Sequence, residues 1–200
     1  MEGLGSVIGS SGAWKRAIME ITPLRLNGTY QIDLAPHCDE RGYFMRVWDE
    51  QLARQHGLTT AWVQENQSLS RHKGIIRGLH FQRPPHAETK LVRVAAGAIL
   101  DVFVDLRKGS PTYGQWDSLE LSAENHRVVY IPKGFAHGFC TLTEEALTVY
   151  KVDAYYAPES EGGLRWDDEV LRINWPTRDP LMSDKDKRLP SFKEFVSPFE

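Results

Sequence analysis

Cysteine is scarce in this sequence of 200 residues. Its two cysteines, Cys38 and Cys140, are too few for a disulfide framework and are typical of a protein in a reducing cytoplasm. No apolar run approaches the length of a transmembrane helix, so we expect no membrane partner. Positive charge is not in excess, because the formal net charge is -3 at pH 7, which gives no support for general nucleic-acid binding.

Internal repeats and low-complexity segments, which would indicate a repeat array, are absent as well. A hydrophobic content of 41% over this length fits one domain with a substantial core. The first residues are rich in glycine and serine and lack a basic leader followed by a long apolar core. We therefore expect a flexible extension over residues 1–18 and a single domain over residues 19–200.

Many short stretches of strand character follow at regular spacing, with turn residues between them. Two weak helical patterns are also present: Asp49 to His56, with Gly57 as its stop, and one turn within 166–175. The pattern predicts an all-β sandwich or barrel with a few short helices. The expected strands are a hairpin over 21–34 around Asn27-Gly28, an aromatic strand entered by a turn within 39–44, and the segments 62–69, 98–106, 116–121, 127–131, 135–142 and 146–156.

The stretch from Gly74 to Gly97 is predicted to form two strands joined by a turn at Pro84-Pro85. Buried polar side chains are costly unless they are paired or used in chemistry, so we place the candidate site in this stretch. The segment is otherwise apolar enough to be buried, yet it carries four polar side chains: Arg77, His80, Gln82 and Lys90.

The spacing in this stretch resembles the first motif of the cupin β-barrels, in which glycine is followed after five residues by histidine, here His80. The later sequence IPKGFAH, ending at His137, has the PxGxxH form of their second motif. Metal-binding cupins carry a second histidine where this chain has Gln82, and a glutamate where it has Lys90. A charged ammonium has no lone pair for a metal and repels a divalent cation. The resemblance therefore predicts a cupin-type jelly roll without a metal, with Lys90 facing an anion such as an enolate oxygen or a phosphate.

Eleven sequence blocks together resemble the dTDP-4-dehydrorhamnose 3,5-epimerase family, which belongs to the cupin-type β-barrels. They occur in order and cover nearly all of the chain from about Glu20 to Asp186. The blocks are DERGYF (39–44), VQENQS (63–68), IRGLHFQ (76–82), KLVR (90–93), DVFVDLRKGSPTYGQW (101–116), IPKGFAHGF (131–139), YK (150–151), YYAPESEGG (155–163), RWDD (165–168), INWP (173–176) and SDKD (183–186).

The resemblance implies epimerisation at C3 and C5 of dTDP-4-keto-6-deoxy-D-glucose, giving dTDP-4-keto-L-rhamnose. Both carbons lie next to the C4 ketone, so a base can remove each proton if the enolate is stabilised. An acid then returns a proton to the opposite face. Such chemistry requires neither a metal nor another cofactor. The resemblance also implies a dTDP-sugar substrate and a homodimer that exchanges N-terminal strands.

The resemblance also implies roles for individual residues. His80 matches the catalytic base, Asp186 the carboxylate that orients this base, and Tyr150 the general acid. We assign Lys90 to the C4 oxygen and Arg77 to the enolate or the diphosphate, because both roles need a preorganised positive charge. The other substrate-binding positions are Arg41 and Phe44, expected to act from the neighbouring subunit, Gln64 and Asn66 in the nucleotide region, the second pocket histidine His137, and Tyr155 as a platform for the thymine ring.

Each of these residues also has an ordinary structural explanation. Without the resemblance, His80 fits a hydrogen-bonded core histidine, Tyr150 a core or interface side chain, and Asp186 a solvated surface charge. Two further alternatives stay open at this point. Lys90 fits an exposed lysine at the end of a turn, and Tyr155 fits a core aromatic. The sequence is equally compatible with His137 binding the sugar or packing within its turn.

One position departs from the family pattern. Typical members carry glutamate two residues after Phe44, where this chain has Arg46, a change of two charge units. Coulomb energies of about 1–4 kcal/mol are involved if this position touches substrate. The departure leaves open the exact sugar nucleotide, inversion at C3 or C5 alone, a 3,4-ketoisomerase, or a non-catalytic sugar-nucleotide-binding cupin. A metal-dependent cupin oxygenase fits least, because Gln82 and Lys90 interrupt the ligand set.

Overall fold

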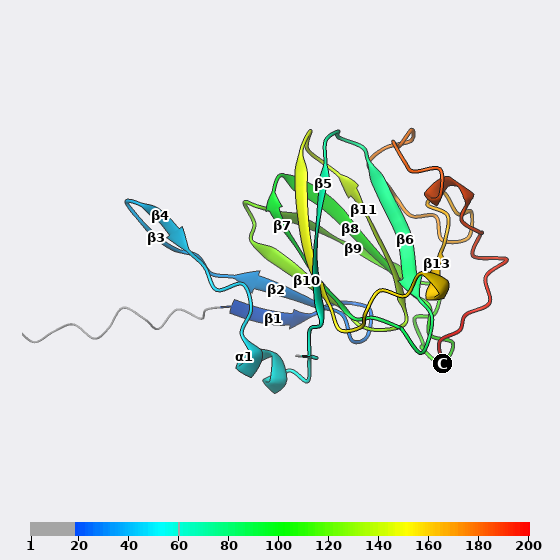
Figure 1. Ribbon diagram of the computed structural model, residues 1–200, viewed down its shortest axis with the longest axis horizontal. Helices are drawn as coiled ribbons and strands as arrows, with labels where there is room; N and C mark the ends of the chain where they lie inside the picture. The colour runs from blue at the N-terminus through cyan, green and yellow to red at the C-terminus, as the bar shows by residue number, and fades with distance from the viewer. Residues whose placement is uncertain (1–18, 60) are drawn as a thin grey trace, which may run out of the picture.

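The computed structural model describes residues 19–59 and 61–200, so the extension expected over residues 1–18 lies outside the described part of the chain. Two antiparallel sheets make up the body of the protein (Figure 1). The six-stranded sheet has the order β1 (Met19–Pro23), β2 (Tyr30–Leu34), β10 (Arg127–Ile131), β7 (Lys90–Ala96), β12 (Ala146–Val152) and β5 (Gln64–Ser70). The five-stranded sheet has the order β13 (Glu161–Gly163), β6 (Ile76–Gln82), β11 (Phe135–Thr141), β8 (Ala98–Asp105) and β9 (Trp116–Ser122).

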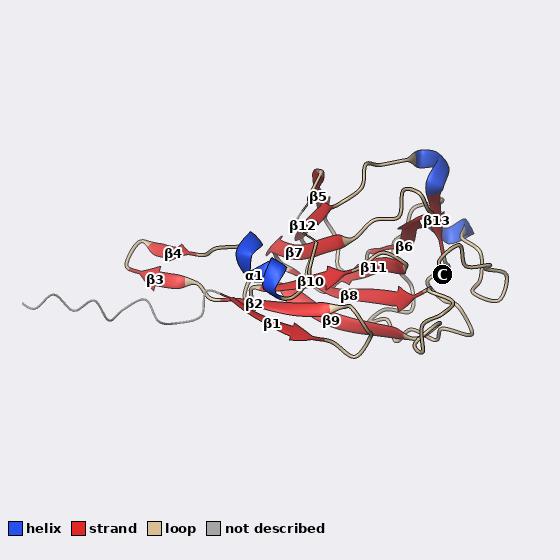
Figure 2. Cartoon of the chain, turned by 90° about the horizontal axis from the view of Figure 1, so that it is seen from below, coloured by secondary structure: helices blue, strands red, loops and turns tan. Residues whose placement is uncertain are grey.

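The remaining elements are short. Among the described residues, strands β3 (His37–Asp39) and β4 (Gly42–Phe44) pair only with each other. The helices of this part of the chain are α1 (Glu50–Gln55) and the 3₁₀ turns η1 (Pro158–Ser160) and η2 (Asp186–Arg188). Strands therefore dominate the chain, as Figure 2 shows, and the all-β prediction is confirmed. No helix in the described ranges is long and apolar enough to cross a bilayer.

A core between the two sheets explains why they stay together. Val92 of β7 and Val129 of β10 belong to the same buried cluster as Ile99 and Phe103 of β8 and Phe135 of β11. The Phe103 and Phe135 rings pack edge to face with centroids 6.3 Å apart. Full burial of each such side chain stabilises the fold by about 1.5–3 kcal/mol. The apolar residues that alternate along these strands thus form the interface between the two sheets.

Several expected elements form at or within two residues of the expected boundaries. Strand β10 covers 127–131, and β1 and β2 form the hairpin around Asn27-Gly28. Helix α1 begins where Asp49, its N-cap, accepts a hydrogen bond from the Leu52 amide at 3.1 Å. It stops before Gly57, whose φ of 69° is the left-handed conformation common after a helix.

Two expectations concern the later part of the chain, and one of them is wrong. Strand β12 ends at Val152 instead of Tyr156, because the Asp153 carboxylate accepts the Thr89 amide at 2.7 Å and the chain bends there. The single helical turn expected within 166–175 is present: the Arg172 amide donates to the Asp168 carbonyl at 2.9 Å, and the turn does not continue into a helix. The Asp168 carboxylate accepts the amides of Val170 and Leu171 at 2.9 Å each, which caps the start of this turn.

The stretch 74–97 forms two strands, but these lie in different sheets. Strand β6 belongs to the five-stranded sheet and β7 to the six-stranded sheet, so the chain crosses from one layer to the other at Pro84-Pro85. This crossing places His80 and Lys90 on opposite sheets.

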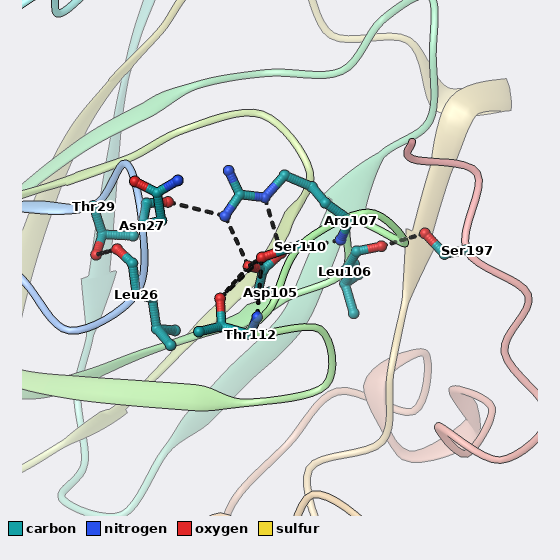
Figure 3. Close-up of polar contacts among 9 residues, drawn as sticks. All are labelled: Leu26, Asn27, Thr29, Asp105, Leu106, Arg107, Ser110, Thr112 and Ser197. Carbon is teal, nitrogen blue, oxygen red and sulfur yellow. Dashed lines mark hydrogen bonds and ion pairs between the residues drawn. The ribbon is translucent and has the colours of Figure 1, made fainter.

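A buried aspartate, Asp105, organises the loop after β8 and, through Arg107, its contact with the β1–β2 turn (Figure 3). Asp105 is fully buried and accepts hydrogen bonds from Arg107 Nε at 2.9 Å, Ser110 Oγ at 2.5 Å and Thr112 Oγ1 at 2.6 Å. Arg107 also donates to the Asn27 carbonyl at 2.9 Å, which anchors the β1–β2 turn. Burial raises the pKa of Asp105, but the hydrogen bonds outweigh burial and hold this pKa below its ordinary value.

The β3–β4 hairpin extends away from the two-sheet body in both views (Figures 1 and 2). Tyr43 and Phe44 at its end are 59% and 67% exposed. Large exposed aromatics on a projecting hairpin are typical of a contact surface.

Candidate active site

A cavity of about 500 Å³ is lined by residues of both sheets and of the segment 181–186. Six of the eleven predicted site residues line it. Arg77, His80 and His137 come from the five-stranded sheet, Lys90 and Tyr150 from the six-stranded sheet, and Asp186 from η2. The structure therefore brings together side chains that lie up to 109 positions apart in the sequence, from Arg77 to Asp186.

His80 is paired with Asp186. The Nε2 atom of His80 lies 2.7 Å from Asp186 Oδ1, and Asp186 Oδ2 accepts the Gly78 amide at 3.3 Å. Burial raises the pKa of Asp186, but the hydrogen bonds from His80, Gly78 and Ser183 outweigh burial and hold this pKa below its ordinary value. Asp186 is therefore an ionised carboxylate that fixes the orientation of the His80 ring.

His137 forms a second histidine–aspartate pair. It lies directly opposite His80 in the β6–β11 ladder, and its Nε2 is 2.8 Å from Asp101 Oδ2. Asp101 is fully buried, and burial raises its pKa, although His137 and Lys90 oppose that rise. Asp101 is not among the site residues predicted from the sequence. An acidic residue within the apolar segment 98–106 was the available signal.

Lys90 and Tyr150 lie together on the six-stranded sheet. The Lys90 ammonium is 5.5 Å from the centroid of the Tyr150 ring and 2.5 Å from Glu88 Oε1. Burial raises the pKa of Tyr150, the Glu88 charge raises it further, and Arg77 opposes both. Glu88 is also not among the predicted site residues, although in an extended chain it shares a face with Lys90, two residues later. The alternative of an exposed lysine is wrong, because Lys90 is buried.

Arg77 lines the same cavity and is held there by two hydrogen bonds. Its Nε donates to Ser70 Oγ at 3.2 Å and its NH2 donates to the Leu69 carbonyl at 3.3 Å. Both acceptors belong to β5, so the guanidinium bridges the two sheets. A fixed guanidinium suits recognition of a phosphate or an enolate oxygen.

The other five predicted site residues are not among the described residues that line the cavity. Arg41 and Phe44 are on the projecting hairpin, where Arg41 is paired with Asp39. Gln64 accepts the Tyr156 amide at 2.8 Å, and Asn66 lies on β5 opposite Tyr150. Tyr155 is 67% exposed, so the core alternative for this side chain is wrong.

Gln82, at the second histidine position of the metal-binding motif, has a structural environment. Its Nε2 donates to the His86 carbonyl at 3.0 Å and the Tyr155 carbonyl at 3.2 Å, and its Oε1 accepts the Ala157 amide at 2.7 Å. Gln82 is buried and holds the loop after β12 against β6. Its amide is thus committed to three backbone partners, and Nε2 also contacts Glu88 Oε2 at 3.4 Å.

Comparison with known proteins agrees with this geometry. The family model for dTDP-4-dehydrorhamnose 3,5-epimerase matches residues 23–194. A protein of that name from Shigella flexneri is 48% identical over 149 residues, which are 74% of this chain and 82% of the relative. The crystal structure of a Bacillus anthracis dTDP-4-dehydrorhamnose 3,5-epimerase, with TDP and PPi bound, is 45% identical with a TM-score of 0.85. That match covers 86% of this chain and 99% of the other.

A more distant relative carries a narrower name. The dTDP-4-dehydrorhamnose 3-epimerase of Streptomyces niveus is 38% identical over 170 residues, covering 84% of this chain and 82% of the relative. The fold and the cavity together define a cupin-like isomerase. Within that class, the chain belongs to the dTDP-4-dehydrorhamnose 3,5-epimerase family.

Proposed function

We propose that this protein epimerises C3 and C5 of dTDP-4-keto-6-deoxy-D-glucose and releases dTDP-4-keto-L-rhamnose. One observation carries the proposal: His80 with its aspartate and Tyr150 line a single cavity from opposite sheets. Epimerisation needs a base on one face of the sugar and an acid on the other. The position of the two groups on facing sheets supports such an arrangement.

At each carbon, the reaction breaks a C–H bond and forms a new one on the opposite face. The base takes the proton, and the bonding electron pair moves into an enolate whose negative charge lies on the C4 oxygen. The acid then protonates the carbon from the other side, and the ketone returns at C4. The C4 ketone already acidifies both carbons, so the protein needs to supply two proton-transfer groups and positive charge near the oxygen.

We assign the base to His80. Because His80 Nε2 faces the ionised Asp186, the ring carries its proton on that nitrogen, and Nδ1 is left as the basic nitrogen. The carboxylate also stabilises the imidazolium that forms when the base accepts the proton. The His80 side chain is 39% exposed, so a sugar in the cavity can reach it.

We assign the acid to Tyr150, since its raised pKa keeps the phenol protonated at neutral pH. Lys90, next to the Tyr150 ring, is assigned to the C4 oxygen. Arg77 is assigned to the enolate or the diphosphate, and His137 to a hydrogen bond with the sugar. These positive and hydrogen-bonding groups are held in place before reaction, which is the condition for strong stabilisation of developing charge.

We further propose a homodimer that exchanges its N-terminal strands, with Arg41 and Phe44 reaching the partner's site. The projecting hairpin with its exposed aromatics and the position of β1 at a sheet edge support this arrangement. Gln64 and Asn66 on β5 and the exposed Tyr155 ring are assigned to the nucleotide. The free thiols of Cys38 and Cys140 are in keeping with a cytoplasmic location.

Solvent exchange tests the function. The protein is incubated in heavy water with dTDP-4-keto-6-deoxyglucose, and deuterium is read at each carbon by NMR. We expect label at both C3 and C5 with the ketone still at C4. Absence of label despite nucleotide binding would contradict catalysis on this substrate and favour another nucleotide or a binding protein.

Epimerisation at C3 alone is the second candidate, because one relative is named a 3-epimerase. Label at one carbon would favour it, and a ketone moved to C3 would indicate a 3,4-ketoisomerase. In either case, Arg46 is the first residue to substitute. Its guanidinium is 3.3 Å from Asp49 of the same chain, so its charge is balanced locally beside α1.

A further inference from the structure

Glu88 is a charged residue beside the site that has no role in the proposed reaction. Its side chain is only 13% exposed, and its two oxygens lie 2.5 Å from Lys90 Nζ and 3.4 Å from Gln82 Nε2. Glu88 is not among the described residues lining the cavity, whereas Lys90 is. Lys90 therefore lines the cavity, and Glu88 contacts the Lys90 ammonium without lining the cavity itself.

The Lys90–Glu88 pair lies beside Tyr150, where the charge of Glu88 can affect the ionisation of the phenol. The Lys90 ammonium is 5.5 Å from the Tyr150 ring centroid. An unopposed cation at that distance in a partly buried site favours the tyrosinate over the phenol. A proton donor has to keep its proton until the enolate is ready to take it. A carboxylate bound to the ammonium cancels much of this effect on the phenol.

We propose that Glu88 is a positioning residue, which holds the Lys90 ammonium toward the C4 oxygen and keeps Tyr150 a protonated acid. The inference rests on the roles proposed above for Lys90 and Tyr150. Glu88 itself touches neither substrate nor reacting atoms. It lets one small cavity contain both a cation for the enolate and a neutral acid for the carbon.

The other charges around Tyr150 do not replace this contribution. Burial is the largest cause of the raised pKa of Tyr150, Glu88 is the next, and Arg77 acts in the opposite direction. On β5, the residue opposite Tyr150 is the uncharged Asn66. The titratable and charged groups that share the cavity with Tyr150 are Arg77 and His80 of β6, Lys90 of β7, His137 of β11, and Lys185 and Asp186 at η2.

The substitution Glu88→Gln tests the inference, because it keeps the shape of the side chain and removes its charge. The ionisation of Tyr150 is followed by NMR in protein labelled with ¹³C at the tyrosine Cζ, and Tyr150→Phe assigns the signal. We expect ionisation in Glu88→Gln to begin about one pH unit lower than in wild type, the size typical of one nearby charge. Glu88→Asp, which retains the charge, should stay close to wild type.

Glu65→Gln is the matched control. Glu65 pairs with Lys151, the residue after Tyr150, and lies opposite this lysine in the β5–β12 ladder. The variant therefore removes one negative charge close to Tyr150 along the strand, from a residue that does not line the cavity. Its Tyr150 titration should be unchanged. In turnover, the alkaline limb of the pH profile of kcat should move to lower pH in Glu88→Gln alone, with KM changed by less than about twofold.

An unchanged Tyr150 titration in folded Glu88→Gln would overturn the inference, as would an equal shift in Glu65→Gln. The titration requires no substrate, so it decides the point even if the proposed reaction is absent. Failure of wild-type protein to label any substrate carbon would instead contradict the proposed function. Circular dichroism of each variant establishes that the comparison is between folded proteins.

Discussion

His80 and His137 lie directly opposite each other on β6 and β11, and each imidazole is hydrogen-bonded to its own buried aspartate. The two pairs differ in access. The His80 side chain is 39% exposed and the His137 side chain 10% exposed. Only the first therefore offers a ring that a substrate can approach freely, which is the physical ground for assigning the base to His80 and a supporting role to His137.

His80→Ala should abolish epimerisation. Loss of a general base typically lowers the rate by about 10²–10⁴-fold, and here both carbons depend on it. Deuterium incorporation measures the rate, and calorimetry with dTDP measures nucleotide binding, which we expect to remain. His86→Ala, on the turn between β6 and β7, is the control and should behave as wild type. Near-normal turnover in His80→Ala would contradict the assignment.

Tyr150→Phe should separate the two halves of the reaction. The phenol acts after the enolate has formed, so its loss should reduce the epimerised product more than the initial exchange of substrate protons. NMR measures both in one heavy-water sample. Tyr113→Phe, on a partly exposed ring that packs against Phe192, is the control. Equal values of both rates in Tyr150→Phe and wild type would make Tyr150 a structural residue.

Asp105→Asn should destabilise the fold by about 2–4 kcal/mol, because Arg107 loses its buried partner. The pKa of Asp105 is held below its ordinary value of 3.8, so its stabilising contribution is complete above that value and is lost as pH falls through the folded-state pKa. The difference in the free energy of unfolding between variant and wild type should be largest near pH 7 and should become smaller below about pH 4.

Urea unfolding at several pH values measures this difference. Asp117→Asn is the control, since Asp117 is paired with Arg25 at 3.7 Å near the surface and should contribute less than about 1 kcal/mol. A difference for Asp105→Asn that does not change with pH would show that the charge of Asp105 is not the source of its effect.

Mixed dimers test the proposed contribution of Arg41 to the partner's site. Arg41→Ala and His80→Ala should each be inactive alone, yet a heterodimer of the two retains one site with both residues intact. After random subunit exchange, we expect recovery of about a quarter of wild-type activity. Arg54→Ala, which removes an exposed arginine paired with Glu50, is the control and should stay active alone. Failure of the mixture to recover activity, with dimers shown by sedimentation, would rule out sharing of Arg41.

The elements that form from neighbouring residues were predictable from the sequence. The Asn27-Gly28 hairpin, the helix capped by Asp49 and strand β10 all follow from turn chemistry, capping and alternation. The glycine–histidine spacing and the PxGxxH turn also directed attention to His80 and His137. The local expectation that failed, a strand continuing over 153–156, was changed by a carboxylate that bonds to the backbone, a competition that hydrophobic periodicity does not register.

The sequence by itself determined the strand-rich architecture, the family resemblance and the identity of most of the polar residues in the cavity. Only the tertiary structure decided how they pair. Asp186 reaches His80 across 106 residues, Asp101 reaches His137 across 36, and Glu88 neutralises Lys90 beside Tyr150. Such pairings depend on which strands are neighbours and in which register they meet. Local side-chain periodicity does not specify either, because strand order is set by packing of the whole core.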